Sequence, residues 1–144
     1  MALQLRNASL LKPMVTLAGW TFVMETWMYA TRLPALEKYE CRLDPEHVSA
    51  DMNTKLPISI RQIADNFNHL HQQPQVFYAV SLALTILGDN HPYTQFAAWG
   101  YVGIRIFHSL FQSLSNVILN RLKIFVASSL VLAGLTGRLA QLVF

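Results

Sequence analysis

The sequence predicts an all-α integral membrane protein, a bundle of four transmembrane helices. Two observations lead to this prediction. Of 144 residues, 53% are hydrophobic and only 13% are charged, whereas a soluble domain carries about 25% charged residues. The apolar residues also gather in four blocks, at residues 10–29, 76–87, 96–119 and 124–144, with polar stretches between them. A membrane-spanning helix needs about 20 mostly apolar residues, and three of the blocks reach this length.

The predicted helices cover residues 10–31, 57–88, 92–118 and 121–144 and form one domain over residues 1–144. The second apolar block is too short to cross a bilayer alone. The residues before it are polar but compatible with a helix, so the second helix is expected to have a long polar first half.

A soluble four-helix bundle with a large core is the alternative fold. The helices of such a bundle carry a charged outer face. Between Val126 and Val143, however, the only charged residue is Arg138. This absence of a charged face favours the membrane protein.

The connections between the helices predict the orientation. The first connection, residues 32–60, is polar and basic, and Pro34 and Pro45 make a continuous helix there unfavourable. The turn at residues 88–92 has no Lys or Arg, whereas the third connection carries Arg121 and Lys123. The positive-inside rule therefore puts the first and third loops in the cytoplasm and both termini on the opposite side.

The remaining composition excludes some classes of protein. Cys41 is the only cysteine, so no disulfide can form within the chain. The net charge of +3 suits a membrane surface, and nothing in the sequence indicates nucleic-acid binding. His69 and His71 lie on different helix faces with no third convergent ligand, so no metal site is expected.

Polar residues form one stripe on each of the two central helices, at helical spacing. On the second helix they are Arg61, Asp65, Asn68 and Gln72, with His69 beside them. On the third helix they are Tyr101, Arg105, His108, Gln112 and Asn116. Helices joined by a short turn run antiparallel and adjacent, so we expect the stripes to face each other across a polar cleft. The cleft would open towards the basic loops, where Arg32 and Arg121 can join it.

The residue types in this cleft suit a small anionic peptide. Guanidinium groups of Arg32, Arg105 and Arg121 bind carboxylates or thiolates in a forked geometry. Three amide side chains add neutral donors and acceptors: Asn68, Gln72 and Gln112. Glutathione is one candidate ligand. The structural alternatives are that Arg105 pairs with Asp65 or Glu25, that His108 is a hydrogen-bonded core imidazole, and that Arg121 only sets the topology.

Two segments resemble a known family. Residues 61–78 and residues 98–108, with an Arg-x-x-His pair at Arg105 and His108, are similar to the MAPEG family of membrane-associated proteins in eicosanoid and glutathione metabolism. The resemblance implies a homotrimer in the lipid bilayer, with glutathione as co-substrate bound between subunits near the cytosolic face.

The resemblance also implies roles for individual residues. Arg105 and His108 would contact the peptide, Arg32 would hold a carboxylate, and Arg121 would be the catalytic cation that stabilises the thiolate. The remaining residues implied in binding are Tyr101, Asn68, His71, Gln72 and Gln112.

The chain departs from the family pattern at two positions. Enzymes of the family have Asn-x-x-Glu shortly before a Pro. Anchored on Pro74, this sequence has Asn68 at the Asn position and His71 at the Glu position. Sliding the register by one residue puts His69 and Gln72 there instead. Gln112 stands where a Tyr is common.

Three functions follow as hypotheses. The first is a glutathione-dependent transferase or peroxidase whose lipophilic electrophiles enter laterally from the bilayer. The alternative is a non-catalytic MAPEG-fold protein that binds a lipid or a partner protein. The third is an unrelated small transport or channel subunit in which the polar stripes line a pore.

Overall fold

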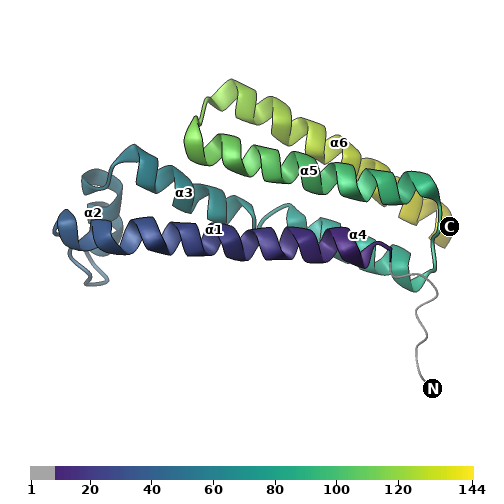
Figure 1. Cartoon of the computed structure of the whole chain (residues 1–144), viewed down its shortest axis with the longest axis horizontal. Helices are drawn as coiled ribbons and strands as arrows, with labels where there is room; N and C mark the ends of the chain where they lie inside the picture. Colours follow the sequence, from purple (N-terminus) through teal and green to yellow (C-terminus); the bar gives the residue numbers. More distant parts are fainter. Residues whose placement is uncertain (1–8) are drawn as a thin grey trace, which may run out of the picture.

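The computed structural model describes residues 9–144, and every regular element in that part of the chain is an α-helix (Figure 1). The helices are α1 (Leu11–Lys38), α2 (Val48–Lys55), α3 (Ile58–His69), α4 (Pro74–Ile86), α5 (Pro92–Leu114) and α6 (Ile118–Val143). The predicted all-α fold class is confirmed. Residues 1–8 of the predicted domain lie outside the described residues.

The long helices form four antiparallel rods, with α3 and α4 following each other along the second rod (Figure 1). The helices α5 and α6 lie side by side as a hairpin, and α5 also packs against α3 and α1. The α4–α5 turn and the end of α6 lie at one end of the bundle. At the other end, α2 lies beside the end of α1 and the start of α3.

The second rod is broken where the sequence predicts one helix over residues 57–88. Helix α3 ends at His69 and α4 begins at Pro74, because a proline ring removes a backbone donor and clashes with the preceding helical turn. The break is tied to α6: the Nε2 of Gln73 donates to the Oγ of Ser129 at 2.5 Å. The rod therefore has a polar half and an apolar half with a fixed junction.

The first helix and the loop after it also differ from the prediction. Helix α1 continues through Pro34 to Lys38, so Pro34 does not end it as expected. Pro34 lies four residues before the end of α1, so the backbone hydrogen bond that its missing N–H cannot make is lost only near the end of the helix. The short helix α2 follows Pro45 inside the loop. Helix α5 ends four residues early because Asn116 takes a positive φ of 47°.

Two apolar clusters position the central helices. The larger one joins α1, α4, α5 and α6, and in it the rings of Phe77 and Tyr101 stack at a centroid distance of 4.5 Å. The second joins α1 to α3 through Met24, Met28 and Ile63, together with Ala64 and Leu70. The second cluster fixes which face of α3 turns towards α1.

The outer surface carries large apolar side chains; Phe96, for example, is 79% exposed. Among the described residues, α6 is the helix that is by itself both long and apolar enough to cross a membrane. Helix α4 has only 13 residues, or about 20 Å of length. Helix α5 has 23 residues and is long enough, but its polar residues make it too polar by the same test. Several of these polar residues are buried inside the bundle. The other three predicted crossings stay a prediction.

The α4–α5 turn is tied to α6 by a buried ion pair. The carboxylate of Asp89 accepts from Arg138 Nη2 at 3.0 Å and from Thr94 Oγ1 at 2.7 Å. Burial alone would raise the pKa of Asp89, but these hydrogen bonds outweigh burial and hold the pKa below its ordinary value. Arg138, the only charged residue between Val126 and Val143, therefore takes part in the packing between α6 and the α4–α5 turn.

Truncating a core residue of α4 tests this packing. Leu84 is fully buried, whereas Leu82 on the same helix is 46% exposed. We expect Leu84→Ala to lower the free energy of unfolding by about 2 kcal/mol, because it leaves a cavity that the surrounding helices cannot close. The matched variant Leu82→Ala should stay within about 0.5 kcal/mol of the parent. Thermal unfolding of the detergent-solubilised protein measures both, and equal losses would contradict the described orientation of α4.

Candidate functional site

Helix α5 turns a continuous polar face into the bundle. Arg105 and Gln112 are fully buried and His108 almost so, at successive turns of the helix. Tyr101 precedes them on the same face and is also fully buried. Burying such groups is costly unless they are paired or bind a ligand. The structure thus brings together the four predicted α5 residues inside the bundle, whereas Asn116 lies beyond the end of the helix.

Helix α3 supplies the opposite wall of this polar interior. The Nε2 of Gln62 donates to the carbonyl oxygen of Ser113 at 2.6 Å, and the Nδ2 of Asn66 donates to the Oγ of Ser109 at 2.7 Å. One turn further, Arg105 Nη2 donates to the carbonyl oxygen of His69 at 3.1 Å. The two helices are therefore held together by polar contacts along their whole interface.

The predicted stripe of α3 is not the one that faces α5. Asp65, Asn68 and Gln72 are exposed on a different face of the rod, as is His71. The physical reason is the apolar cluster around Ile63, which rotates α3 so that its apolar side meets α1. The expectation that the two predicted stripes face each other within one chain is wrong for α3. The binding roles of Asn68, His71 and Gln72 stay a prediction.

The residues predicted from the sequence do not include Gln62 and Asn66, which contact α5 from α3. A signal was present, because Gln62, Asn66, His69 and Gln73 are spaced as regularly as the predicted stripe. Both stripes are polar, so periodicity alone does not tell which one is buried. The position of the apolar residues relative to α1 decides between them.

Arg105 is the most unusual group of the site. Its side chain is 0% exposed, and no carboxylate of residues 9–144 lies within ion-pair distance. Within the same residues its Nε and Nη1 atoms have no hydrogen-bond partner. The predicted alternative of a pair with Asp65 or Glu25 is not formed. A buried cation without a counter-ion is strongly unfavourable, so this geometry favours the entry of an anion.

A pocket of about 250 Å³ opens next to Arg105 between α5 and the start of α6. It is lined by His69, His108, Ile118, Arg121, Leu122 and Phe125. The guanidinium carbon of Arg105 lies 5.8 Å from the centroid of the Phe125 ring, within the range of a cation–π contact. The pocket therefore combines two imidazoles and a guanidinium with an apolar rim.

Arg121 is held at the mouth of this pocket. Its Nη1 donates to the Oδ1 of Asn116 at 2.9 Å. Asn116 occupies a left-handed backbone conformation between the two helices, which Asn tolerates better than most residues. The turn thus positions Arg121, the predicted catalytic cation. Asn116 lies beyond the end of α5 and takes part in the site by accepting this hydrogen bond from Arg121.

Arg32 lies at a separate cavity of about 170 Å³ between α1, α2 and α3. There it meets Arg61, Asp65 and Asn68. The Nη2 of Arg32 contacts the Sδ of Met52 at 2.8 Å, and thioether sulfur is only a weak acceptor. Within one chain, Arg32 does not reach the pocket that holds Arg121.

Helix α2 is fastened beside this cavity by a buried carboxylate. Asp51 accepts from the backbone N–H, Nε and Nη2 of Arg42 and from the Nζ of Lys55. These contacts, with Arg42 the largest cause, hold the pKa of Asp51 well below its usual range. The fold of the first loop therefore depends on an ionised Asp51.

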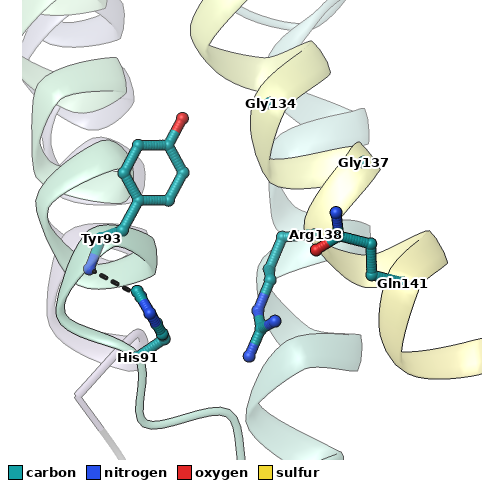
Figure 2. Close-up of a pocket in the computed structure, with 6 residues that line it drawn as sticks. All are labelled: His91, Tyr93, Gly134, Gly137, Arg138 and Gln141. Atoms are coloured by element: carbon teal, nitrogen blue, oxygen red, sulfur yellow. Dashed lines mark hydrogen bonds between the residues drawn. The ribbon is translucent and has the colours of Figure 1, made fainter.

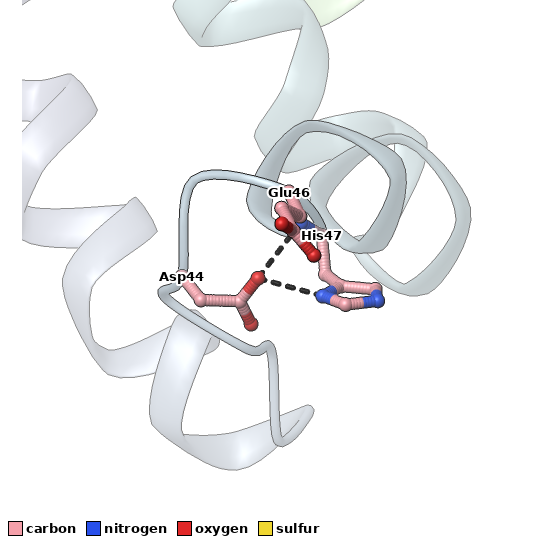
Figure 3. Close-up of side chains that lie close together, drawn as sticks. All are labelled: Asp44, Glu46 and His47. Carbon is pink, nitrogen blue, oxygen red and sulfur yellow. Dashed lines mark hydrogen bonds and ion pairs between the residues drawn. The ribbon is translucent and has the colours of Figure 1, made fainter.

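A possible metal-ligand group lies just before α2. Asp44, Glu46 and His47 bring one ligand atom each within 4.8 Å of the others (Figure 3). The Nδ1 of His47 is 2.6 Å from the Oδ1 of Asp44, and this contact lowers the pKa of Asp44. The sequence predicts no metal site, and Asp44, Glu46 and His47 are not among its candidate residues. Its internal contacts are explained by the tight turn that leads into α2.

Comparison with known proteins gives one match. The sequence model of the MAPEG family matches residues 10–141 of the chain. No curated protein and no solved structure matches the chain. The match covers all four rods, including the α3–α5 interface and the pocket at Arg121.

Acidification tests the role of Asp51. A carboxylate whose pKa is lowered by folding stabilises the folded loop fully at pH values above its unfolded pKa, about 3.9. This contribution is lost progressively as the pH falls from that value through the lower pKa of the folded state. We expect hydrogen–deuterium exchange of residues 48–55, corrected for intrinsic rates, to rise below about pH 4. Asp51→Asn should exchange rapidly at every pH, whereas Glu46→Gln should keep the parent profile. Slow exchange in Asp51→Asn would show that the carboxylate does not hold α2.

Proposed function

The chain belongs to the MAPEG family of membrane proteins, and we propose that it is a glutathione-dependent transferase or peroxidase acting on lipophilic electrophiles. The observation that supports this proposal most is the buried guanidinium of Arg105 without an acidic partner. It lies beside a pocket that also offers Arg121, His69 and His108. Such a site is suited to a small ligand with carboxylates and a thiolate.

Arg121 is proposed as the cation that activates the thiol. A free thiol has a pKa of about 8.5 and is mostly protonated at neutral pH, whereas the thiolate is the nucleophile. A guanidinium at the pocket mouth favours the anion over the thiol. His108, which lines the pocket, and Arg105, which is buried beside it, are proposed to contact the peptide part of the ligand.

The rim of the pocket supports entry of the second substrate from the bilayer. Ile118 and Leu122 line the pocket and are 70% and 55% exposed. A lipophilic electrophile dissolved in lipid can cross this apolar rim, while glutathione enters from water. In conjugation, the sulfur attacks the electrophilic carbon to form a C–S bond, and the leaving group departs with the electron pair of the bond that breaks.

We further propose four membrane crossings and a homotrimer. Asp65, Asn68, Gln72 and Gln75 form an exposed polar stripe along α3 and α4. Polar side chains within a bilayer are unfavourable unless they contact other polar groups. A second copy of the chain at this face would cover the stripe and bring Asn68, His71, Gln72 and Arg32 to a site shared between subunits.

The proposed orientation places the pocket at the cytoplasmic side. Arg121 and Lys123 start α6 at the same end of the bundle as the basic first loop. By the positive-inside rule these loops face the cytoplasm, where glutathione is available, and the α4–α5 turn faces the opposite side.

The alternative function is a non-catalytic membrane protein that binds a lipid or a partner protein. It is favoured by the lining of the pocket, in which the described part of the chain places no carboxylate to bind an ammonium group. Gln112, at the position where the family has a Tyr, is fully buried, and neither atom of its amide has a partner among the described residues. Glutathione binding separates the two functions.

A calorimetric titration tests glutathione binding. We expect the solubilised protein to bind glutathione at millimolar concentration or below. The affinity should fall at least about tenfold in Arg105→Ala, because one charge-assisted hydrogen bond contributes about 1.5–3 kcal/mol. His108→Gln, which keeps a hydrogen-bonding group but removes the imidazole, provides a second variant in case Arg105→Ala does not fold. Its affinity for glutathione should also be lower than that of the parent. Absence of heat for the folded parent protein would exclude the transferase and favour the alternative.

Turnover tests the role of Arg121. We expect conjugation of a chlorinated nitrobenzene at pH 7 to slow by about tenfold or more in Arg121→Ala, since an opposite charge lowers a nearby pKa by about 1–3. The rate of the variant should recover as the pH approaches the pKa of the free thiol. Lys123 is an exposed cation two residues further along α6 and therefore on another face of the helix. Lys123→Ala is the matched control and should keep the parent rate. Equal rates in Arg121→Ala and the parent would remove Arg121 from the mechanism.

A further inference from the structure

A third cavity lies between the start of α5 and the end of α6, at the end of the bundle away from Arg121. It has a volume of about 360 Å³ and is lined by His91, Tyr93, Gly134, Gly137, Arg138 and Gln141. Figure 2 shows His91 and Tyr93 on one side of the cavity and Arg138 and Gln141 on the other. The proposed glutathione site contains none of these residues.

The polar groups around the cavity can all donate hydrogen bonds. The Nδ1 of His91 accepts from the backbone N–H of Tyr93 at 3.2 Å. A neutral imidazole then carries its proton on Nε2, so this atom is a donor. The hydroxyl of Tyr93, the amide of Gln141 and the guanidinium of Arg138 add further donors. Among residues 9–144, no carboxylate lines the cavity.

Arg138 is fixed in place by Asp89. Its Nε and Nη2 donate to the two carboxylate oxygens at 3.3 and 3.0 Å. The guanidinium plane is therefore oriented, and its Nη1 is not used in this pair. Because Asp89 neutralises the charge of Arg138, long-range attraction of a free anion is weak. The site instead suits a phosphate group that is already held nearby.

Two glycines of α6 keep the cavity open. A Cβ added at Gly137 would meet no atom within 4 Å, and one added at Gly134 would meet only the Oη of Tyr93, at 3.1 Å. The glycine face leads from Gln141 towards the apolar middle of α6. An acyl chain can follow this face while a headgroup stays among the donors.

The position of the cavity matches the depth of lipid headgroups. The apolar rods end at the α4–α5 turn and at the end of α6 (Figure 1). In a membrane protein these ends lie in the interfacial region of the bilayer, where the headgroup phosphates are concentrated.

We propose that this cavity binds the phosphate of a phospholipid headgroup, with an acyl chain along Gly134 and Gly137. The site is independent of glutathione and of catalysis, so either proposal can fail without the other. It assigns a ligand-binding role to the end of the bundle away from Arg121.

Lipid binding by the purified full chain tests the proposal. Native mass spectrometry in detergent measures the affinity for dioctanoyl phosphatidic acid, with dioctanoylglycerol and inorganic phosphate as comparison probes. We expect phosphatidic acid to bind at least about tenfold more tightly than dioctanoylglycerol, since each hydrogen bond to a charged group contributes about 1.5–3 kcal/mol. Gly137→Leu, which fills the cavity, should weaken this binding by about tenfold or more, and Gln141→Leu should weaken it through loss of a donor.

The matched control is Gly103→Leu, on the neighbouring helix α5. A Cβ at Gly103 also meets no atom within 4 Å, so both glycine variants add the same side chain at an open position. Gly103→Leu should bind phosphatidic acid like the parent. Equal affinity of the parent and Gly137→Leu would overturn the proposal, as would equal binding of dioctanoylglycerol and phosphatidic acid. Displacement of the lipid by inorganic phosphate at equal concentration would overturn the lipid assignment and point to free phosphate.

Discussion

The buried guanidinium of Arg105 is the constraint on which the structure of the site depends. It lies inside a helix bundle with one hydrogen bond, to the carbonyl oxygen of His69, and without a carboxylate in reach among residues 9–144. A cation in such a position is tolerated only if neighbouring dipoles and a ligand compensate for its lost hydration. The side chains around it are arranged accordingly, with amides and hydroxyls of α3 and α5 on one side and the pocket with Arg121 on the other.

The rotation of α3 links this site to the packing of the whole bundle. The apolar residues Ile63 and Leu70 contact α1, and this contact turns Gln62 and Asn66 towards α5. The remaining polar face of the same helix, which carries Asp65 and Asn68, is exposed in the part of the chain that the structure describes. One helix therefore serves three surfaces: the apolar packing with α1, the polar interior with α5, and an outer stripe suited to a second subunit.

The sequence was sufficient for some of these features and insufficient for others. Composition and block length predict an all-α membrane fold, because lipid requires long apolar helices. The inward face of α5 is also predictable, since Arg105 and His108 share one face and would be unfavourable in lipid. The face of α3 was not predictable from periodicity, because two polar stripes one residue apart compete there. The break at Pro74 was missed because the residues before it are compatible with a helix, and α2 because its polar sequence lacks an apolar pattern.

The break between α3 and α4 separates two tasks along one rod. Helix α4 is mostly apolar and packs in the larger apolar cluster, while α3 carries the polar groups that contact the neighbouring helix α5. Gln73 joins the junction to Ser129 of α6. The start of α4 is therefore held by a contact that does not involve the side chains of α3. The exposed polar side chains of α3 can therefore be replaced without altering how α4 packs, and chains with different surface chemistry can share one support.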